Sequence, residues 1–272
     1  MNRGIRTIIA FFVLSTASPF IGNSEPPTPE ISEIARQITV RILTDSGTGS
    51  GVIIQREKHT YIIVTNRHVV DDHQEKTYTI LTPDGQTHQA HLLGMGRWGD
   101  GETGGRGDGE MGGRGDSGTG RDDEDIAWLQ FTCYQKYTVA EIADNNRLNI
   151  GDVVYAAGFP SWYEISENKI TNTREWGLKA FQWTTGTVGM LPETPLEEGY
   201  QLGYTNNIVS GMSGGPILNH QGELVGINGR SAYPLSGIET FKFVDGTFPP
   251  EPLFKQMETF SWGIPLNRKK PG

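Results

Sequence analysis

Three residues of this chain have the types and local settings that nucleophilic catalysis requires: His68, Asp125 and Ser213. Ser213 lies in the segment 211–216, Gly-Met-Ser-Gly-Gly-Pro, which predicts a sharp turn that leaves the hydroxyl group exposed. A serine hydroxyl is a weak nucleophile at neutral pH and needs an adjacent general base. An imidazole can take the proton as the oxygen attacks a carbonyl, and a buried carboxylate can orient that imidazole. We therefore expect these three side chains to act together.

The same turn can also stabilise the negative charge that develops on an attacked carbonyl oxygen. We expect it to present the backbone N–H groups of Gly211 and Ser213 as an oxyanion hole. One such donor contributes about 10²–10³-fold in rate. Gly211 can adopt the required backbone conformation because it has no Cβ.

Each residue also has a simpler interpretation on its own: a packed or surface histidine, a carboxylate at a strand start, and a serine in an ordinary turn. Gly211, Ser213 and Gly215 also match the Gly-x-Ser-x-Gly nucleophile elbow of α/β-hydrolases. That fold needs a histidine after the serine, where the chain offers only His220, seven residues on. Because the alternating helices are missing as well, we favour the order histidine, aspartate, serine.

The elements that must position these residues are predicted to be short strands joined by turns. Apolar, often β-branched runs bounded by Gly, Pro, Asn and Asp are typical of strands. In the first half they cover 38–43, 52–54, 61–65, 76–81, 86–93 and 125–131. In the second half they cover 153–160, 179–187, 200–206, 215–219, 224–228 and 260–264. Helical periodicity is nearly absent, apart from a short helix that Pro29 could begin. We predict an all-β chain in two halves with a cleft between them.

A glycine-rich repeat interrupts the first half of the chain. The segment 99–106 is followed by a second copy over 107–114 and a degraded third copy over 115–121. With almost no apolar residues, the repeat cannot offset the entropy of ordering, so we predict a disordered loop insertion over 95–123. Loop length adds little to the entropic cost of closure.

Two more specific interpretations of the repeat have less support than a disordered loop. The Arg-Gly-Asp tripeptides at 106–108 and 114–116 match an adhesion motif, but any repeat rich in these residue types generates it. The calcium-binding β-roll repeat has a nonapeptide period and places its aspartate differently. A calcium-dependent adhesion module is therefore kept only as an alternative for this segment.

The N-terminus predicts export. Arg3 and Arg6 precede the apolar run 8–14 and then small residues, the pattern of a signal peptide, so we expect residues 1–24 to form a signal peptide and leader. The run is too short to span a bilayer comfortably, so we expect no stable membrane insertion after cleavage. We expect a periplasmic, lumenal or secreted location.

Charge and cysteine content narrow the class further. The formal net charge of −9 argues against nucleic acid or an anionic membrane as the main partner. Cys133 is the only cysteine, so no internal disulfide can form, which is more typical of a bacterial-type exported domain than of a disulfide-stapled one.

Several segments resemble motifs of the trypsin-like serine peptidases and occur in the same order as in that family. The histidine box is Thr-Asn-Arg-His-Val-Val, the aspartate strand is Asp-Ile-Ala-Trp-Leu, and the serine box is Gly-Met-Ser-Gly-Gly-Pro. The resemblance extends to the strands before the histidine and after the serine, and to the closing strand of the HtrA/Deg branch. In order, these segments are 49–53, 65–70, 125–129, 211–216, 224–228 and 263–265.

This resemblance implies two six-stranded antiparallel β-barrels packed with the active site in the cleft between them. The peptidase domain would cover 31–266, with barrels over 31–133 and 150–266. It implies an exported serine endopeptidase that cleaves protein or peptide substrates through the triad and an acyl-enzyme intermediate, with no metal and no organic cofactor. The alternative is a binding or scaffold protein on the same fold whose site is unused.

Substrate preference is predicted by the same analogy. The pocket for the P1 side chain would be formed by 207–210, including Asn207 and Ile208, and by 228–230, including Asn228 and Gly229. The first segment contains no carboxylate, so we expect a small or apolar P1 residue rather than Lys or Arg. Arg230 could instead favour an acidic residue.

Two departures from the family pattern concern activation and domain content. The chain has no Ile-Val-Gly-Gly activation sequence, and Met212 replaces the acidic residue that receives the new N-terminus in digestive members. We therefore expect no zymogen cleavage beyond removal of the signal peptide. No PDZ domain is expected, since the sequence stops at Gly272.

Overall fold

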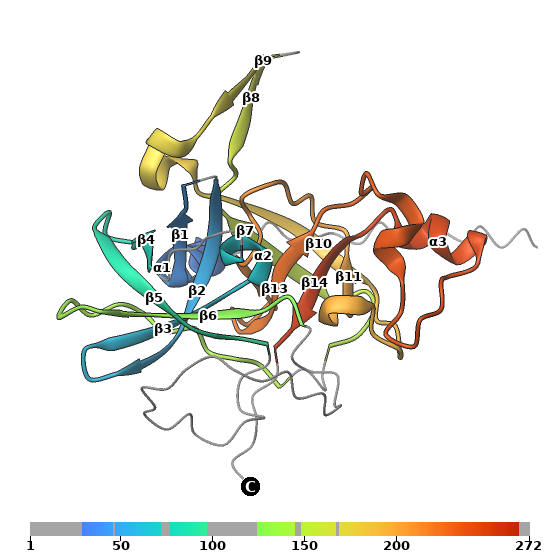
Figure 1. The fold of residues 1–272 in the computed structure, drawn as a ribbon, viewed down its shortest axis with the longest axis horizontal. Coiled ribbons are helices and arrows are strands. Elements are labelled where there is room, and N and C mark those ends of the chain that lie inside the picture. The colour runs from blue at the N-terminus through green and yellow to red at the C-terminus, as the bar shows by residue number, and fades with distance from the viewer. Residues whose placement is uncertain are drawn as a thin grey trace, which may run out of the picture.

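The computed structural model of the protein describes residues 29–266, except 46, 72–76, 97–123, 145–147 and 167–168 (Figure 1). The expected leader over 1–24, and the expected insertion over 95–123 apart from its first two residues, lie outside the described part. Within the described part, no helix is long and apolar enough to cross a membrane.

Most strands of the described part of the chain form two closed antiparallel barrels, six strands in each. The N-terminal barrel has the order β1-β2-β3-β6-β5-β4, and the C-terminal barrel has the order β10-β11-β14-β13-β12-β7. The predicted all-β fold of two six-stranded barrels is therefore confirmed. The first barrel contains β1 (Thr39–Leu43), β2 (Thr48–Glu57), β3 (Thr60–Thr65), β4 (Thr77–Leu81), β5 (Thr87–Met95) and β6 (Ala127–Thr132). The second contains β7 (Val153–Gly158), β10 (Gln182–Met190), β11 (Leu202–Tyr204), β12 (Pro216–Leu218), β13 (Leu224–Arg230) and β14 (Ser261–Pro265).

Both faces of strand β3 are apolar because each packs in a different core. Successive side chains of a strand point to opposite faces. Tyr61 and Ile63 pack inside the N-terminal barrel, whereas Ile62 and Val64 belong to a second cluster that also contains Trp262 of β14. The second cluster also includes buried residues of α1 (Pro29–Ile38), so one core runs from this helix across the first barrel to the second. The end of β3 is thus held from both sides.

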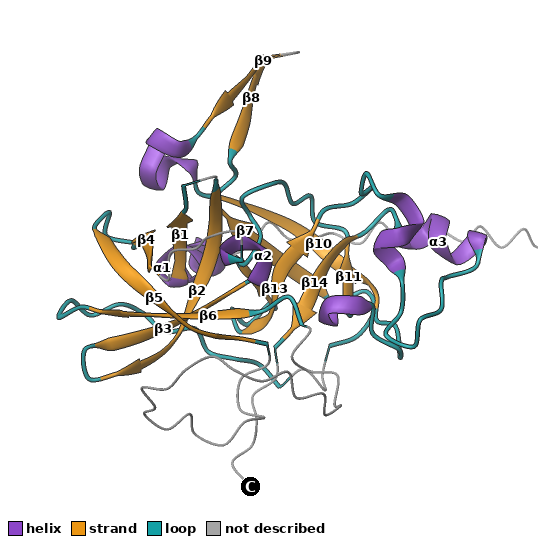
Figure 2. Ribbon diagram, viewed as in Figure 1, coloured by secondary structure: helices purple, strands orange, loops and turns teal. Residues whose placement is uncertain are grey.

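The remaining elements are short, and strands predominate in Figure 2. A two-stranded sheet of β8 (Trp162–Ser166) and β9 (Lys169–Asn172) projects away from both barrels (Figure 1). The strand pattern of the sequence did not predict this hairpin or the helix α3, and it extended β11 by several residues. The short elements are α2 (Arg67–Val70), η2 (Arg174–Ala180), η3 (Glu197–Gly199), η4 (Gly237–Phe241) and α3 (Glu251–Met257).

Candidate active site

The register of two strands brings His68 and Asp125 together. Thr65, the last residue of β3, pairs with Ala127, the first residue of β6. His68 follows that strand end within α2, and Asp125 lies just before β6, so both residues emerge at the same edge of the sheet. The His68 Nδ1 atom lies 2.6 Å from Asp125 Oδ2, and the His68 backbone N–H donates to Asp125 Oδ1 at 2.8 Å. One histidine therefore engages both carboxylate oxygens.

Asp125 is buried and has a partner at every polar position. Its side chain is 6% exposed, against 49% for that of His68. The Tyr200 hydroxyl donates to Oδ2, the same oxygen that His68 approaches. The Asp125 N–H donates to the Glu198 carbonyl at 2.9 Å, and its carbonyl accepts from the Asn66 side chain at 2.9 Å. Because a buried charge is costly unless it is paired and hydrogen-bonded, these partners are what allow a carboxylate here.

The turn that carries Ser213 depends on two glycines in the left-handed region. Gly211 has φ +92° and Gly214 has φ +80°. A Cβ on Gly211 would lie 2.5 Å from the Phe159 carbonyl oxygen and the Ser161 nitrogen. A Cβ on Gly214 would clash with the Ser50 carbonyl oxygen. The glycines therefore serve both backbone conformation and close packing.

The backbone N–H groups of this turn divide into two sets. Those of Met212, Gly214 and Gly215 donate to the carbonyls of Val209, Asn228 and Met212, at 3.0, 2.9 and 3.0 Å. Within the described residues, the N–H groups of Gly211 and Ser213 have no hydrogen-bond partner. Unpaired donors next to a serine hydroxyl are the arrangement that an oxyanion hole requires before substrate binds.

Ser50 of β2 connects this turn to the N-terminal barrel. Its N–H donates to the Ser213 carbonyl at 2.9 Å, and its hydroxyl donates to the Gly211 carbonyl at 2.8 Å. The same hydroxyl accepts from the Phe159 N–H at 2.8 Å, and Ser50 is fully buried. The sequence motif placed Ser50 only in a strand before the histidine; the available signal was a small hydroxyl residue between Gly49 and Gly51.

The Ser213 hydroxyl is hydrogen-bonded to a backbone carbonyl rather than to His68. It donates to the carbonyl oxygen of Gly229 at 3.2 Å, and no hydrogen bond joins it to the imidazole in the part of the chain that the structure describes. The turn nevertheless packs at the end of β3, since a Cβ on Gly214 would meet Thr65 and Asn66, just before His68. The structure thus joins two of the three predicted residues directly and places the third in a neighbouring turn.

The predicted P1 residues take different positions. Asn207 is exposed, whereas Ile208 is 3% exposed and packs in the core of the C-terminal barrel. The Asn228 side chain is fully buried; its Nδ2 donates to the Ala157 carbonyl at 2.8 Å, and its Oδ1 accepts from Tyr204 at 2.7 Å. Gly229 lies against the Tyr200 ring, with no room for a Cβ. Ile208 and Asn228 therefore build the support of the site rather than its surface.

Arg230, at the end of β13, is already neutralised by neighbouring groups. Its Nη2 lies 2.5 Å from a Glu198 carboxylate oxygen, and its Nη1 donates to the Thr240 carbonyl at 2.6 Å. The guanidinium carbon lies 3.9 Å from the centre of the Tyr200 ring. These contacts argue against Arg230 as a free cation for an acidic substrate residue.

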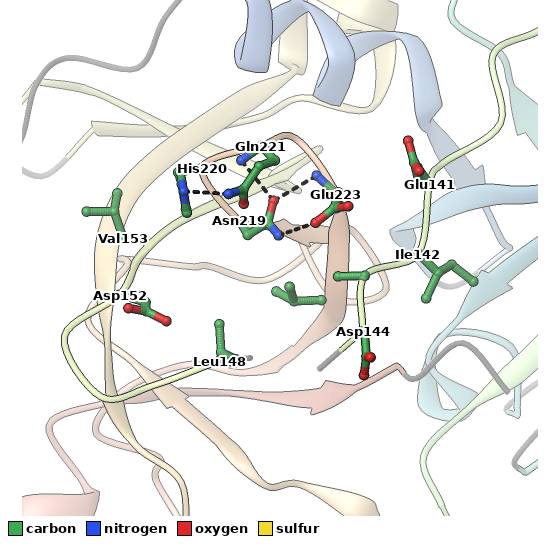
Figure 3. A pocket seen from close by; sticks show the side chains of 12 residues that line it. Glu141, Ile142, Asp144, Leu148, Asp152, Val153, Asn219, His220, Gln221 and Glu223 are labelled. Atoms are coloured by element: carbon green, nitrogen blue, oxygen red, sulfur yellow. Dashed lines mark hydrogen bonds between the residues drawn. The ribbon is translucent and has the colours of Figure 1, made fainter. Parts of the chain in front are cut away.

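A pocket of about 410 Å³ is lined by residues of the segments 141–153 and 219–225 (Figure 3). It contains four carboxylates and His220, and none of the three candidate catalytic residues lines it. Among the described residues, no group of three or more His, Cys, Asp or Glu side chains could hold a metal ion. The lining residues are Glu141, Ile142, Ala143, Asp144, Leu148, Asp152, Val153, Asn219, His220, Gln221, Glu223 and Val225.

Comparison with known proteins gives the family. The sequence model of the trypsin-like peptidase domain matches residues 49–227. The chain is 31% identical over 194 residues to the periplasmic pH-dependent serine endoprotease DegQ of Escherichia coli (strain K12), covering 70% of this chain and 33% of that protein. It is 28% identical over 208 residues to the serine protease Do-like HtrB of Bacillus subtilis (strain 168), covering 76% and 38%. The matches thus span about a third of the length of these relatives. The chain belongs to the trypsin-like peptidase family, in its HtrA/Deg-like branch.

Proposed function

We propose that this protein is an exported serine endopeptidase that hydrolyses peptide bonds in protein or peptide substrates. Two observations together carry the proposal. His68 and Asp125 are joined by two hydrogen bonds, and the neighbouring glycine turn holds Ser213 and two N–H groups without a partner among the described residues. Export is supported by the signal-like N-terminus and by the name of DegQ, a periplasmic protease.

In the proposed mechanism, Ser213 Oγ attacks the scissile carbonyl carbon while His68 Nε2 takes the hydroxyl proton. Asp125 keeps the imidazole oriented by accepting from Nδ1–H and stabilises the imidazolium. The N–H groups of Gly211 and Ser213 stabilise the oxyanion. His68 then gives its proton to the leaving amine, and an acyl-enzyme forms on Ser213. Water attacks this ester with His68 again as base, which releases the acid and restores the hydroxyl.

The Ser213 hydroxyl must first leave the Gly229 carbonyl. A neutral hydrogen bond of this kind contributes about 1 kcal/mol, so the rotation costs little against a catalytic barrier. A substrate N–H that binds the Gly229 carbonyl would take over this acceptor and free the hydroxyl for His68. Substrate binding and alignment of the nucleophile would then occur together.

We expect the substrate residue at the P1 position to be small or apolar. Asn207 offers no charge, and the Arg230 guanidinium is matched by Glu198. A trypsin-like or acidic preference therefore has no free counter-charge among these residues.

Cleavage of a peptide library by the purified protein tests this proposal, with Ser213→Ala as the matched control. We expect wild-type cleavage after small or apolar residues and none by the variant. Cleavage that persists in the variant would reject Ser213 as the nucleophile. A wild-type protein that cleaves nothing would support the alternative of a protease fold used only for binding.

A further inference from the structure

Asp125 is held by a segment of the other barrel. We call residues Glu198–Tyr200, which lie just before β11, the carboxylate clamp. The Glu198 carbonyl accepts the Asp125 N–H at 2.9 Å, and the Tyr200 hydroxyl donates to Asp125 Oδ2. Asp125 lies outside β6, so the hydrogen bonds of its own sheet do not fix its N–H. The clamp supplies that constraint from across the barrel interface.

The Tyr200 contact is buried and directional. Tyr200 is 1% exposed and Asp125 is 5% exposed. Burial, together with the nearby charge of Asp125, raises the pKa of the Tyr200 phenol well above its ordinary value. The phenol therefore stays protonated and acts as a donor throughout the neutral range. Asp125 Oδ2 then accepts from both His68 and Tyr200, while Oδ1 accepts from the His68 backbone.

The clamp is fixed on its other side by the end of β13. The Arg230 guanidinium stacks on the Tyr200 ring, and its Nη2 pairs with the Glu198 carboxylate. Gly229 approaches the same ring too closely for a side chain. Both contacts involve the ring, and neither is a hydrogen bond of the Tyr200 hydroxyl group.

The backbone of the clamp is strained. Glu198 has φ +64°, a left-handed conformation that a residue with a side chain seldom adopts. Gly199 follows with φ +85°, and a Cβ there would lie 2.9 Å from the side chain of Glu124, next to Asp125. Such strain persists only where surrounding contacts impose it, and it concentrates at functional sites.

We propose that Tyr200 is a positioning residue for the peptidase reaction: its hydroxyl fixes Asp125 Oδ2 so that His68 keeps the tautomer and orientation that catalysis requires. This inference rests on the proposed function, because it assigns a role within the same site. Tyr200 does not touch the reacting atoms and acts through Asp125.

Tyr200→Phe tests the inference because it removes the hydroxyl and retains the ring that Arg230 and Gly229 contact. A hydrogen bond to a charged group is lost, so we expect kcat to fall about 10- to 100-fold with KM little changed. Without the Tyr200 hydroxyl as a donor, the Asp125 carboxylate should attract the imidazolium of His68 more strongly. The acid limb of the kcat/KM profile should therefore move to higher pH. Unchanged kcat and an unchanged pH profile would overturn the proposal.

Tyr61→Phe is the matched control. Tyr61 is fully buried in the N-terminal barrel, and its hydroxyl donates to the Gln135 carbonyl at 2.8 Å, away from the candidate site. We expect this variant to lose some stability and to keep the wild-type kcat and pH profile. An equal fall of kcat in both variants would reduce Tyr200 to a purely structural role.

Three further measurements test the inference if Tyr200→Phe is inactive, does not fold or behaves as the wild type. The proton resonance of the His68 Nδ1–H should shift in Tyr200→Phe and not in Tyr61→Phe, whether or not the protein cleaves peptides; no shift would overturn the inference. If Tyr200→Phe does not fold, ortho-fluorotyrosine at position 200 keeps a stronger donor and should move the acid limb to lower pH. If the wild-type protein reacts with a fluorophosphonate probe, the peptidase proposal stands. If the kinetics of Tyr200→Phe then equal those of the wild type, the inference about Tyr200 is rejected on its own.

Discussion

The two halves of the candidate site differ in how completely their polar groups are bonded. Asp125 has a partner at both carboxylate oxygens, at its N–H and at its carbonyl. In the Ser213 turn, the hydroxyl makes one bond of 3.2 Å, and the N–H groups of Gly211 and Ser213 are unpaired within the described residues. Asp125 is thus fully hydrogen-bonded before substrate arrives, whereas the Ser213 turn keeps the donors and the hydroxyl that a substrate would engage.

Ser213→Ala should have the largest effect. Removing the nucleophile of a triad costs about 10⁶-fold in kcat. Because the hydroxyl makes a single hydrogen bond, we expect the thermal unfolding midpoint to change little. Steady-state hydrolysis of the best library peptide and a thermal melt measure the two effects separately. A large loss of stability would mean that the Ser213 hydroxyl, like Asp125, is held by hydrogen bonds that stabilise the fold.

Asp125→Asn should come next, with a fall of about 10⁴-fold in kcat, because the amide cannot hold the imidazole in the same tautomer. The measurement is kcat on the same peptide. Asp84→Asn is the control, since Asp84 accepts from Thr82 and Tyr137 in a turn of the N-terminal barrel. Equal losses in both variants would contradict a special role for Asp125.

Gly211→Ala should disturb the Ser213 turn and leave the hydrogen bonds of Asp125 unchanged. A Cβ would meet the Phe159 carbonyl, and φ +92° disfavours alanine, so the Gly211 N–H should move and kcat should fall about 10²–10³-fold. Gly246→Ala is the control, because Gly246 has φ +84° with nothing within 4 Å of a Cβ. It should cost about 1–2 kcal/mol of stability and leave kcat unchanged. Equal activity of the two variants would argue against an oxyanion hole at Gly211.

The smallest effect concerns how the unfolding free energy depends on the ionisation of Tyr200 at alkaline pH. The raised pKa of Tyr200 means that the folded protein keeps its phenol proton where the unfolded chain loses it. The unfolding free energy should therefore be fully retained below the ordinary tyrosine pKa and should fall above about pH 10, by at most about 1.4 kcal/mol per pH unit for this group. Denaturant unfolding from pH 8 to 11 should show a shallower fall in Tyr200→Phe. An unchanged slope would mean that Tyr200 ionises normally in the folded state.

The sequence was informative where the chemistry lies in short motifs. His68, Asp125 and Ser213 each stand at a strand end or turn with a recognisable local pattern, and alternating apolar residues outline most strands of both barrels. Tyr200 could not be identified this way, because its contact with Asp125 spans 75 positions and its neighbours, Glu-Glu-Gly, indicate only a turn.

Two other differences also have physical causes. Ile208 and Asn228 were predicted to line the substrate pocket, but their side chains pack inward, because position along a motif does not give side-chain direction. The β8–β9 hairpin lacks the pattern of a half-buried strand, since Trp162, Tyr163 and Ile170 are exposed on it.

Fluorophosphonate labelling followed by mass spectrometry of the modified peptide shows whether Ser213 is an activated nucleophile. We predict one covalent adduct on Ser213 in the wild-type protein, no adduct in Ser213→Ala, and slower labelling in Asp125→Asn. A wild-type protein that is never labelled, or an adduct that persists in Ser213→Ala, would contradict the claim that Ser213 is a nucleophile activated by the His68–Asp125 pair.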